Sequence, residues 1–586
     1  MRRFIVGLLA TIGAFTLISL AAGLYVALTG PFSAKPLPDK MVLSVDLRTL
    51  PPESDSTDLL GGIWRDNPPD MATTLQALWR AADDPRVLGL YVEIGDEDGG
   101  LARVQELREA IARFRAKGKF TIGFAESLAS NGERFADYYL AAALDEIWLQ
   151  PSGSFGVTGM AVETPFLKEG LGKLGIRIEG GKRYEYKSAP DTFTEQGYTG
   201  PARQNLQQLL DSLYGQFIDD VSHDRKIPSE RLRQLVDAAP LDPDRAKAEH
   251  LVDKIGYRAD AMAAVWQRAD NVREMVSLDE YSAEQPRRRS GAPVFALVRI
   301  AGAIVSGTAS NSPLDSETTA AADDIVDALD AAARAKQVKA IIVRIDSPGG
   351  TYPAADAIAD GVARARANGK PVIVSMGDVA ASGGYLAAVR ADAIVAEPTT
   401  ITASIGVFGM WPVATDLLKT LGVRFERLKV GSNAGMYSTF LPPTDAQKAA
   451  IARELDSIYA DFTRQVGDAR KLDDARVDRA ARGRVFSGND AKTAGLIDEL
   501  GGLQTALTLA KAKAGIGAST AVELQRFPIE ENRWQRLADR LVRLAGIDSR
   551  GPSIRAPREL RDALARFGIA ARPGNVRLPP LPPLWR

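Results

Sequence analysis

Apolar stretches in the second half of the chain alternate between two patterns. Residues 339–345 form a β-branched run with few polar positions, which predicts a strand buried on both faces. Polar and glycine residues at 346–350 end that run, residues 354–366 predict a helix, and residues 371–376 predict the next strand. Strands separated by helical crossovers indicate a parallel sheet flanked by helices, so we expect an α/β fold.

The same pattern occurs twice along the chain, at a spacing far longer than that of a solenoid repeat. The matched pairs keep their order, and their offset falls from 251 residues for Gly118 and Gly369 to 245 residues for Ala246 and Ala491. The pair Gly99-Gly100 likewise matches Gly349-Gly350. We therefore predict two tandem α/β domains from an internal duplication, over residues 30–285 and 286–522.

The N-terminus has the pattern of a membrane anchor. Arg2 and Arg3 precede an apolar run from Phe4 to Leu28, long enough to cross about 30 Å of hydrocarbon. A cleavable signal peptide has a shorter apolar core of about 7–15 residues, so we expect an uncleaved transmembrane helix within residues 1–29. The two arginines should stay inside, which places the bulk of the chain on the periplasmic or another extracytoplasmic side of the inner (plasma) membrane.

The end of the chain, residues 523–586, differs in character, because it is rich in arginine and ends in a proline-rich segment. Trp534, Leu537 and Leu541 recur there at helical spacing among arginines. Two interpretations stay open: a helix packed on the body or on a neighbouring subunit, or a basic amphipathic helix on anionic lipid.

Composition removes several classes of function. The chain has 586 residues and no cysteine, which excludes a thiol nucleophile, a cysteine-ligated metal and a disulfide framework. Its formal net charge of −1 gives no case for nucleic-acid binding. Only two histidines occur, His223 and His250, which argues against a multi-histidine metal site. Without a Walker loop or dinucleotide motif, we expect no cofactor and no metal, although the composition leaves a carboxylate-only site for Mg or Ca open.

Ser382 is the candidate nucleophile. It lies in a turn of small residues, 380–384, between a predicted strand and a predicted helix. Such a turn would expose its hydroxyl at the carboxyl end of the sheet, beside a helix N-terminus. Gly349 or Gly350, together with Gly383, could donate backbone N–H groups to an oxyanion. Each turn alone is also typical of a helix cap or a simple strand-to-helix connection.

A serine nucleophile needs a base. Lysine is the remaining residue type, and Lys187 is the candidate, although by composition alone it would be a surface lysine. The two histidines fall opposite Gly495 and Asp468 in helical segments of the repeat, so we expect both at the surface. Lys187 must be desolvated to be neutral, and flanking tyrosines at 184 and 186 could shield it, whereas Glu185 would oppose a lowered pKa.

The repeat supports this pair of residues. Lys187 falls opposite Ala434, and Ser382 falls opposite Ala136 if a four-residue insertion is allowed. Each half therefore carries alanine at the position where the other half carries the candidate nucleophile or the candidate base. The pattern predicts one site divided between the two halves.

These segments resemble the signal peptide peptidase A family, also called protease IV, in its long duplicated form. The matching segments are Arg344 to Gly350, Ala381 to Tyr385, Thr402 to Val407 and Tyr186-Lys187-Ser188. The resemblance implies a ClpP- or crotonase-like fold, a membrane anchor, a bowl-shaped homotetramer, and serine endopeptidase activity on hydrophobic peptides such as cleaved signal peptides. It also implies a Ser–Lys dyad of Ser382 and Lys187, with Ser404 as a helper hydroxyl and Gly349 or Gly350 with Gly383 as oxyanion donors.

Two other functions remain open from the sequence. An acyl-CoA enzyme of the crotonase type would also build an oxyanion hole from glycine turns, although an outward-facing anchor argues against CoA chemistry. A catalytically inactive membrane scaffold could retain the same fold, although the set of Ser382, Lys187 and Ser404 argues against it.

Overall fold

The computed structural model describes residues 36–54, 69–95, 99–129, 135–284, 291–309 and 319–528. The predicted transmembrane helix at 4–28 and the amphipathic pattern around Trp534 lie outside these ranges. Within them, none of the helices combines the length and the apolar character needed to cross a membrane.

The first half contains one sheet of six parallel strands, in the order β6-β4-β3-β2-β1-β7. Its strands are β1 (Met41–Leu47), β2 (Val87–Ile94), β3 (Phe120–Ala125), β4 (Glu146–Leu149), β6 (Lys254–Ile255) and β7 (Met275–Ser277), and β5 (Arg177–Arg183) lies outside the sheet. Its helices are α3 (Met71–Asp83), α4 (Leu101–Ala116), α5 (Ala136–Ala141), α6 (Lys168–Lys173), α7 (Asp191–Thr194), α8 (Gly200–Arg225), α9 (Ser229–Asp237), α10 (Pro243–Ala248), α11 (Arg258–Arg268) and α12 (Leu278–Ala283).

The second half contains a sheet in the order β16-β14-β12-β11-β8-β18, with β13 paired to β12 and β17 to β13. Its strands are β8 (Val294–Ala301), β11 (Val338–Ser347), β12 (Val372–Ala381), β13 (Ala393–Ala396), β14 (Ile401–Ala403), β16 (Val485–Ser487), β17 (Glu499–Leu500) and β18 (Glu523–Phe527), with β9 (Ala303–Val305), β10 (Thr319–Ala321) and β15 (Val407–Val413) outside the sheet. Its helices are α13 (Ala322–Arg334), α14 (Tyr352–Ala367), α15 (Gly383–Ala388), α16 (Thr415–Thr420), α17 (Asp445–Arg470), α18 (Asp474–Ala480), α19 (Gly488–Ala494) and α20 (Leu503–Lys513).

The order of elements confirms an α/β fold built twice. The long helices α8 and α17 have 26 residues each, and each ends at a lysine in the left-handed conformation, Lys226 and Lys471. The predicted strands and helix around the nucleophile also form, as β11, α14 and β12. A closer likeness to the ClpP or crotonase fold remains an expectation from the family resemblance.

The predicted boundary between Val522 and Glu523 falls just before a strand of the second sheet. β18 pairs in parallel with β8, as β7 pairs with β1 in the first half, so β18 is the counterpart of β7. The second half therefore continues at least to Phe527. The sequence pattern did not reveal β18, because it is a short edge strand that contains two charged residues, Glu523 and Arg526.

The two halves share a hydrophobic core. Phe295, Leu297, Ala340 and Ile342 of the second sheet pack in one cluster with the interior of the first half, and Leu503 of α20 joins them. A buried ion cluster lies in the same contact region, where Arg344 of β11 binds Glu53 at 2.6 Å and Glu106 of α4 at 2.5 Å. One core cluster therefore continues through both halves, while a second cluster belongs to the second half alone.

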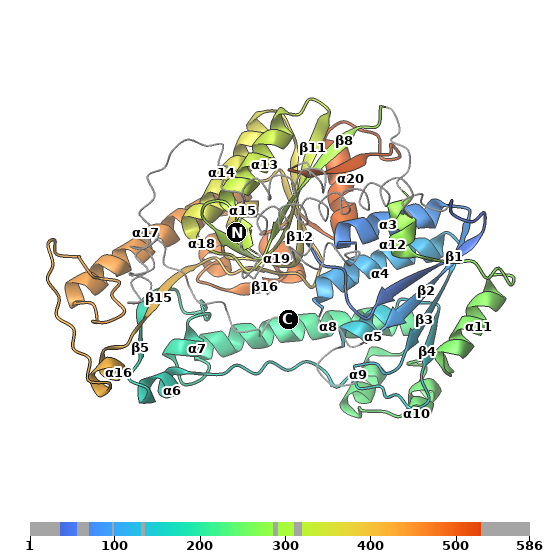
Figure 1. Ribbon diagram of the computed structural model, residues 1–586, viewed down its shortest axis with the longest axis horizontal. Coiled ribbons are helices and arrows are strands. Elements are labelled where there is room, and N and C mark those ends of the chain that lie inside the picture. Colours follow the sequence, from blue (N-terminus) through green and yellow to red (C-terminus); the bar gives the residue numbers. More distant parts are fainter. Residues whose placement is uncertain are drawn as a thin grey trace, which may run out of the picture.

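The first half also reaches across the second through an arm formed by β5, α6, α7 and α8. Figure 1 shows α8 running beneath the second half, from the vicinity of α5 to α7; its 26 residues span roughly 39 Å. β5 pairs antiparallel with β15 of the second half. Asn205 of α8 binds both backbone groups of Val485 on β16, at 2.9 and 2.8 Å, which covers the free edge of that sheet.

Candidate active site

Ser382 lies at the turn that joins β12 to α15, at the carboxyl end of the second sheet. Its backbone has φ 53° and ψ −115°, a conformation that L-residues rarely adopt. Its N–H donates to the Ala403 carbonyl at 2.8 Å, and its carbonyl accepts from Leu386 N–H at 3.0 Å. The strained turn, fixed on both sides, presents the side chain beyond the sheet as a nucleophile elbow does.

The Gly349-Gly350 turn packs directly against the serine. Gly349 has φ 108°, and a Cβ placed there would lie 2.9 Å from Ser382 Cβ and 2.8 Å from Gly383 N. A Cβ on Gly383 would in turn lie 3.0 Å from Gly350 N. Only glycine allows the two turns to approach this closely.

Lys187 is brought to Ser382 by the arm of the first half. It lies between β5 and α7, and its Nζ is 3.0 Å from Ser382 Oγ. The same Nζ donates to the Ser404 carbonyl at 2.8 Å and lies 2.9 Å from Ser404 Oγ. The side chain is 3% exposed, and this burial lowers the pKa of Lys187 to about 7.

The loop that carries Lys187 is held by a segment of the second half, Arg482 to Arg484. The Arg482 carbonyl accepts from the N–H groups of Tyr184 and Tyr186, both at 3.2 Å. A Cβ on Gly483 would lie 2.4 Å from Lys187 N, so the two backbones touch at a glycine. Arg482 also binds Glu185 at 2.8 Å, which provides that carboxylate with its own cation.

Ser404 completes the arrangement from the end of β14. It has φ 51°, and its N–H donates to the Arg484 carbonyl at 2.7 Å. The segment that holds the lysine loop is thus bonded to the residue whose side chain and carbonyl both face the lysine. Ser382, Ser404 and Lys187 form one hydrogen-bonded group drawn from both halves.

All the residues predicted from sequence as site members therefore meet in one place. The contact that sequence reasoning missed is Gly483, for which the repeat held a signal: Gly483 falls opposite Ala238 in the first half. His223 and His250 are exposed, as expected. Across the described ranges, no group of three or more His, Cys, Asp or Glu side chains is placed to bind a metal.

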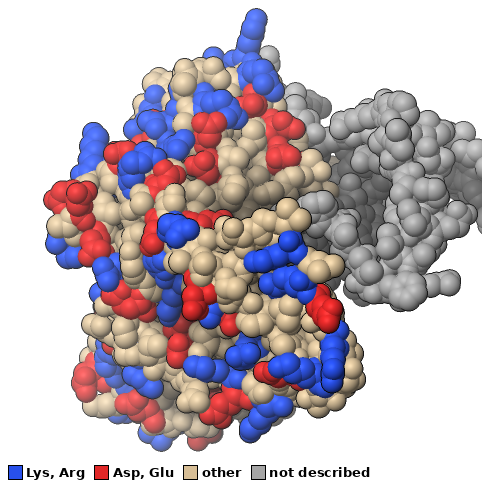
Figure 2. Space-filling view, turned by 90° about the vertical axis from the view of Figure 1, so that its left-hand side faces the viewer, with Lys and Arg blue, Asp and Glu red and all other residues tan. Residues whose placement is uncertain are grey.

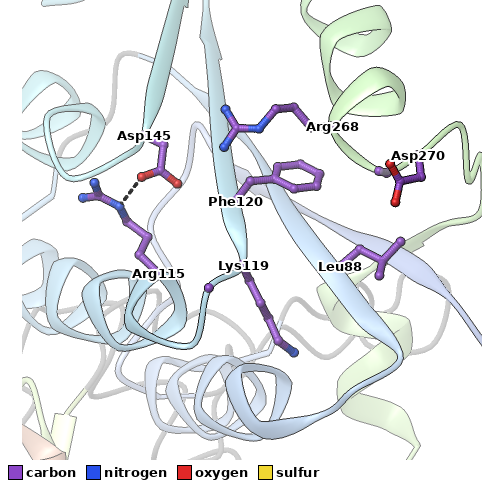
Figure 3. A pocket seen from close by; sticks show the side chains of 9 residues that line it. Leu88, Arg115, Lys119, Phe120, Asp145, Arg268 and Asp270 are labelled. Atoms are coloured by element: carbon purple, nitrogen blue, oxygen red, sulfur yellow. Dashed lines mark hydrogen bonds and ion pairs between the residues drawn. The ribbon is translucent and has the colours of Figure 1, made fainter.

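A pocket of about 430 Å³ opens elsewhere, at the starts of β2, β3 and β4 (Figure 3). In Figure 3, Arg115 meets Asp145, Lys119 points away from both, and Arg268 lies near the Phe120 ring. The second half repeats the arginine–aspartate contact, since Arg366 binds Asp392 at 2.9 Å.

A lysine near each of these arginine–aspartate pairs also makes the same kind of hydrogen bonds in both halves. Lys119 Nζ donates to the carbonyls of Ala81 and Asp84, and Lys370 Nζ donates to those of Ala335 and Val338. A set that occurs in both halves and satisfies carbonyls at the end of a helix or the start of the next strand is a structural device of the repeat. It has no part in the chemistry at Ser382.

Comparisons with known proteins give a family match in each half of the chain. The model of "Peptidase family S49" matches residues 124–272 and 364–517, one region in each half. Protease 4 of Haemophilus influenzae is 31% identical over 470 residues, covering 78% of this chain and 74% of that protein. Protease 4 of Salmonella typhi is 32% identical over 452 residues, covering 74% and 71%. The chloroplastic serine protease SPPA of Arabidopsis thaliana is 30% identical over 459 residues, covering 76% and 66%.

Proposed function

Because the chain belongs to peptidase family S49 and is a serine protease of that family, we propose that it cleaves peptides through a Ser–Lys dyad of Ser382 and Lys187. The observation that carries this proposal is the 3.0 Å contact between Lys187 Nζ and Ser382 Oγ. We also propose that the fold is ClpP- or crotonase-like.

In the proposed acylation step, the neutral Lys187 amine takes the proton of the Ser382 hydroxyl as Oγ attacks the scissile carbonyl. The carbonyl oxygen becomes an oxyanion, which accepts hydrogen bonds from backbone N–H groups. Gly349 N–H already donates to Ser347 Oγ at 3.2 Å, so Gly350 and Gly383 are the donors we propose. Each such donor contributes about 3–4 kcal/mol in enzymes where it has been removed.

The lysine then returns the proton to the leaving amine, and the acyl group stays on Ser382. A water molecule attacks this ester, with Lys187 again as the base, and releases the second product. Ser404 orients Nζ between these steps by its hydroxyl and carbonyl. The support is a lysine whose pKa of about 7 leaves a large neutral fraction near neutral pH.

We propose hydrophobic peptides, including cleaved signal peptides, as substrates, and a membrane location that matches them. The support is the apolar run at 4–28, preceded by Arg2 and Arg3. A single helix there would anchor the chain in the inner membrane, with the peptidase on the periplasmic or extracytoplasmic side. A catalytically inactive scaffold, by contrast, has no need to bury an amine against a serine.

We further propose that copies of the chain associate, as a homotetramer. Apolar side chains are exposed along the segment 421–440, with Leu421 at 66% and both Leu428 and Val430 fully or almost fully exposed. Phe425 and Phe440 stack there, and both remain partly exposed. Figure 2 shows this end of the molecule, with charged side chains scattered among wide uncharged areas. An apolar surface of this kind is typical of association.

The function is tested with the detergent-solubilised full chain and a panel of peptides that differ only in apolar content. We expect cleavage that rises with apolar content in the wild type and is lost in Ser382→Ala. Cleavage that persists in Ser382→Ala would refute the nucleophile, and equal cleavage of polar peptides would refute the substrate class. Light scattering of the solubilised chain measures the number of copies, for which we expect four.

A further inference from the structure

In the first half, the space beside the Gly99-Gly100 turn is filled by a side chain of the second half, Asp378. A Cβ placed on Gly100 would lie 1.9 Å from Asp378 Cγ and 2.1 Å from both of its carboxylate oxygens. Gly100 is the counterpart of Gly350, whose turn faces Ser382 in the second half. The corresponding turn of the first half therefore faces an internal carboxylate.

Asp378 caps helix α4 from outside its own half. Gly100 is the N-cap residue of α4 and has no side chain to fill that role. Asp378 Oδ1 accepts from Arg103 N–H, in the first turn of α4, at 3.0 Å, and Asp378 Oδ2 pairs with Arg103 Nε. A carboxylate at a helix N-terminus is stabilised by both the free N–H groups and the helix dipole.

Asp378 also lies in the irregular part of β12 that leads to the nucleophile. The pairing of β11 with β12 shifts its register between Ile345 and Ser347. Across this irregularity Val379 N–H donates to Asp346 Oδ1 at 2.9 Å. Val379 is thus tied to the second sheet, whereas Asp378 beside it is tied to the first half, three residues before the strand ends and four before Ser382.

Arg103 and Asp346 are the titratable neighbours of Asp378. Burial, and then the charge of Asp378, raise the pKa of Asp346 to about 7. Asp346 is therefore protonated more readily than an ordinary carboxyl group, which limits repulsion between the two side chains. Arg103 is held on its other side by the Pro51 carbonyl at 3.2 Å.

We propose that Asp378 is a positioning residue for the Ser–Lys pair: its trans-cap on α4 fixes the end of β12 to the first half, and so keeps Ser382 aligned with Lys187, which the first half supplies. The glycine turn that faces the serine in one half serves in the other half to bind this carboxylate. This proposal rests on the proposed Ser–Lys dyad.

The test compares Asp378→Ala and Asp378→Asn in the full solubilised chain. Loss of the cap should lower kcat by about 100-fold, as a misplacement near 1 Å does, with KM less affected. Water admitted to Lys187 should move its pKa toward the ordinary value, so the acid limb of kcat/KM should shift to higher pH. Asparagine keeps an oxygen for Arg103 N–H, so it should restore part of kcat and part of the acid limb.

The chain offers a matched control in Arg526→Ala. Arg526 of β18 pairs at 2.7 Å with Asp70, the N-cap of α3, and so makes an Arg–Asp contact between the halves far along the sheet from β12. This variant should have a lower Tm than the wild type, but the acid limb of its kcat/KM profile should stay at the wild-type pH.

An acid limb in Asp378→Ala that coincides with those of the wild type and Arg526→Ala would overturn the proposal, as would an asparagine variant no better than alanine. Failure of the dyad itself is recognised separately, because activity would then survive in Lys187→Ala. If Asp378→Ala does not fold, the asparagine variant alone decides: an unshifted acid limb with unchanged kcat overturns the proposal.

Discussion

Lys187 Nζ lies 3.0 Å from Ser382 Oγ although 195 positions separate the two residues in the chain. The contact depends on the duplication, because the lysine comes from the arm of the first half and the serine from the sheet of the second. It also depends on the shared core, since Phe295 and Ile342 of the second sheet are packed with the first half. The division of labour is therefore built into the packing of the two halves.

The pH dependence of the wild type follows from the pKa of Lys187. Burial lowers that pKa to about 7, and only the neutral amine can accept the serine proton. We expect kcat/KM to rise with pH through about 7 and then to level. The measurement is kcat/KM for one peptide between pH 5 and 9, and an acid limb near the ordinary lysine value of 10.5 would contradict the account.

Lys187→Met should stabilise the protein, most strongly at low pH. The pKa of Lys187 is lower in the folded chain than in the unfolded chain, so below about pH 7 the folded state bears the full cost of a buried charge. That cost is on the order of a few kcal/mol, and it disappears as pH rises toward 10.5.

Denaturant unfolding at pH 6 and pH 10 measures this effect. The variant should exceed the wild type in free energy of unfolding at pH 6, with the gap closing by pH 10. Lys173→Met, at an exposed lysine of α6, is the control and should show little change at either pH. An equal gap at both pH values would show that the effect is not one of charge.

Ser404→Ala should lower kcat without removing it. The change takes away one of the contacts of Lys187 Nζ, the 2.9 Å contact with Ser404 Oγ, and leaves the backbone carbonyl in place. The loss of one hydrogen bond of about 1.4 kcal/mol corresponds to about tenfold in kcat. Steady-state kinetics with the same peptide measure it, and a complete loss equal to that of Lys187→Ala would assign Ser404 a larger role than an orienting one.

Gly349→Ala should abolish activity by disturbing both turns. Its φ of 108° is unfavourable for alanine, and the new methyl would meet Gly383 N, Ala381 O and Ser382 Cβ at 2.8–2.9 Å. The matched control is Gly369→Ala, which also has a positive φ, of 76°, but no atom within 4 Å of the new Cβ. Peptide cleavage should be lost in the first variant and retained in the second, whereas loss in both would point to backbone strain alone.

Much of the site could be predicted because the repeat compares the chain with itself. Alanine at 434 falls opposite Lys187. The predicted match of Ala136 to Ser382 was one residue off, because Phe135 is the N-cap of α5 where Ser382 is the N-cap of α15, but the first half still lacks the serine. The α/β pattern of β11, α14 and β12 was likewise visible, because buried parallel strands and helices have distinct apolar periods.

The geometry that joins the halves could not be predicted in the same way. The arm carrying Lys187 reaches Ser382 because β5 pairs with β15 and because Asn205 covers the edge of β16. These are contacts between distant segments, and no local period encodes them. Gly483 and Asp378 belong to the same class, since their importance depends on the backbone or helix end they meet across the contact between the halves.

The central claim is that one chain supplies both Ser382 and Lys187 to one site. The most direct test is peptide cleavage by Ser382→Ala, by Lys187→Ala and by the two variants co-expressed, with exposed Lys173→Ala as the control. We expect wild-type activity in the control, no activity in either single variant, and none from the co-expressed pair, because neither chain then holds both groups. Activity restored in the co-expressed pair would show that the lysine reaches the serine of another copy, and activity in Lys187→Ala alone would show that the base is a different residue.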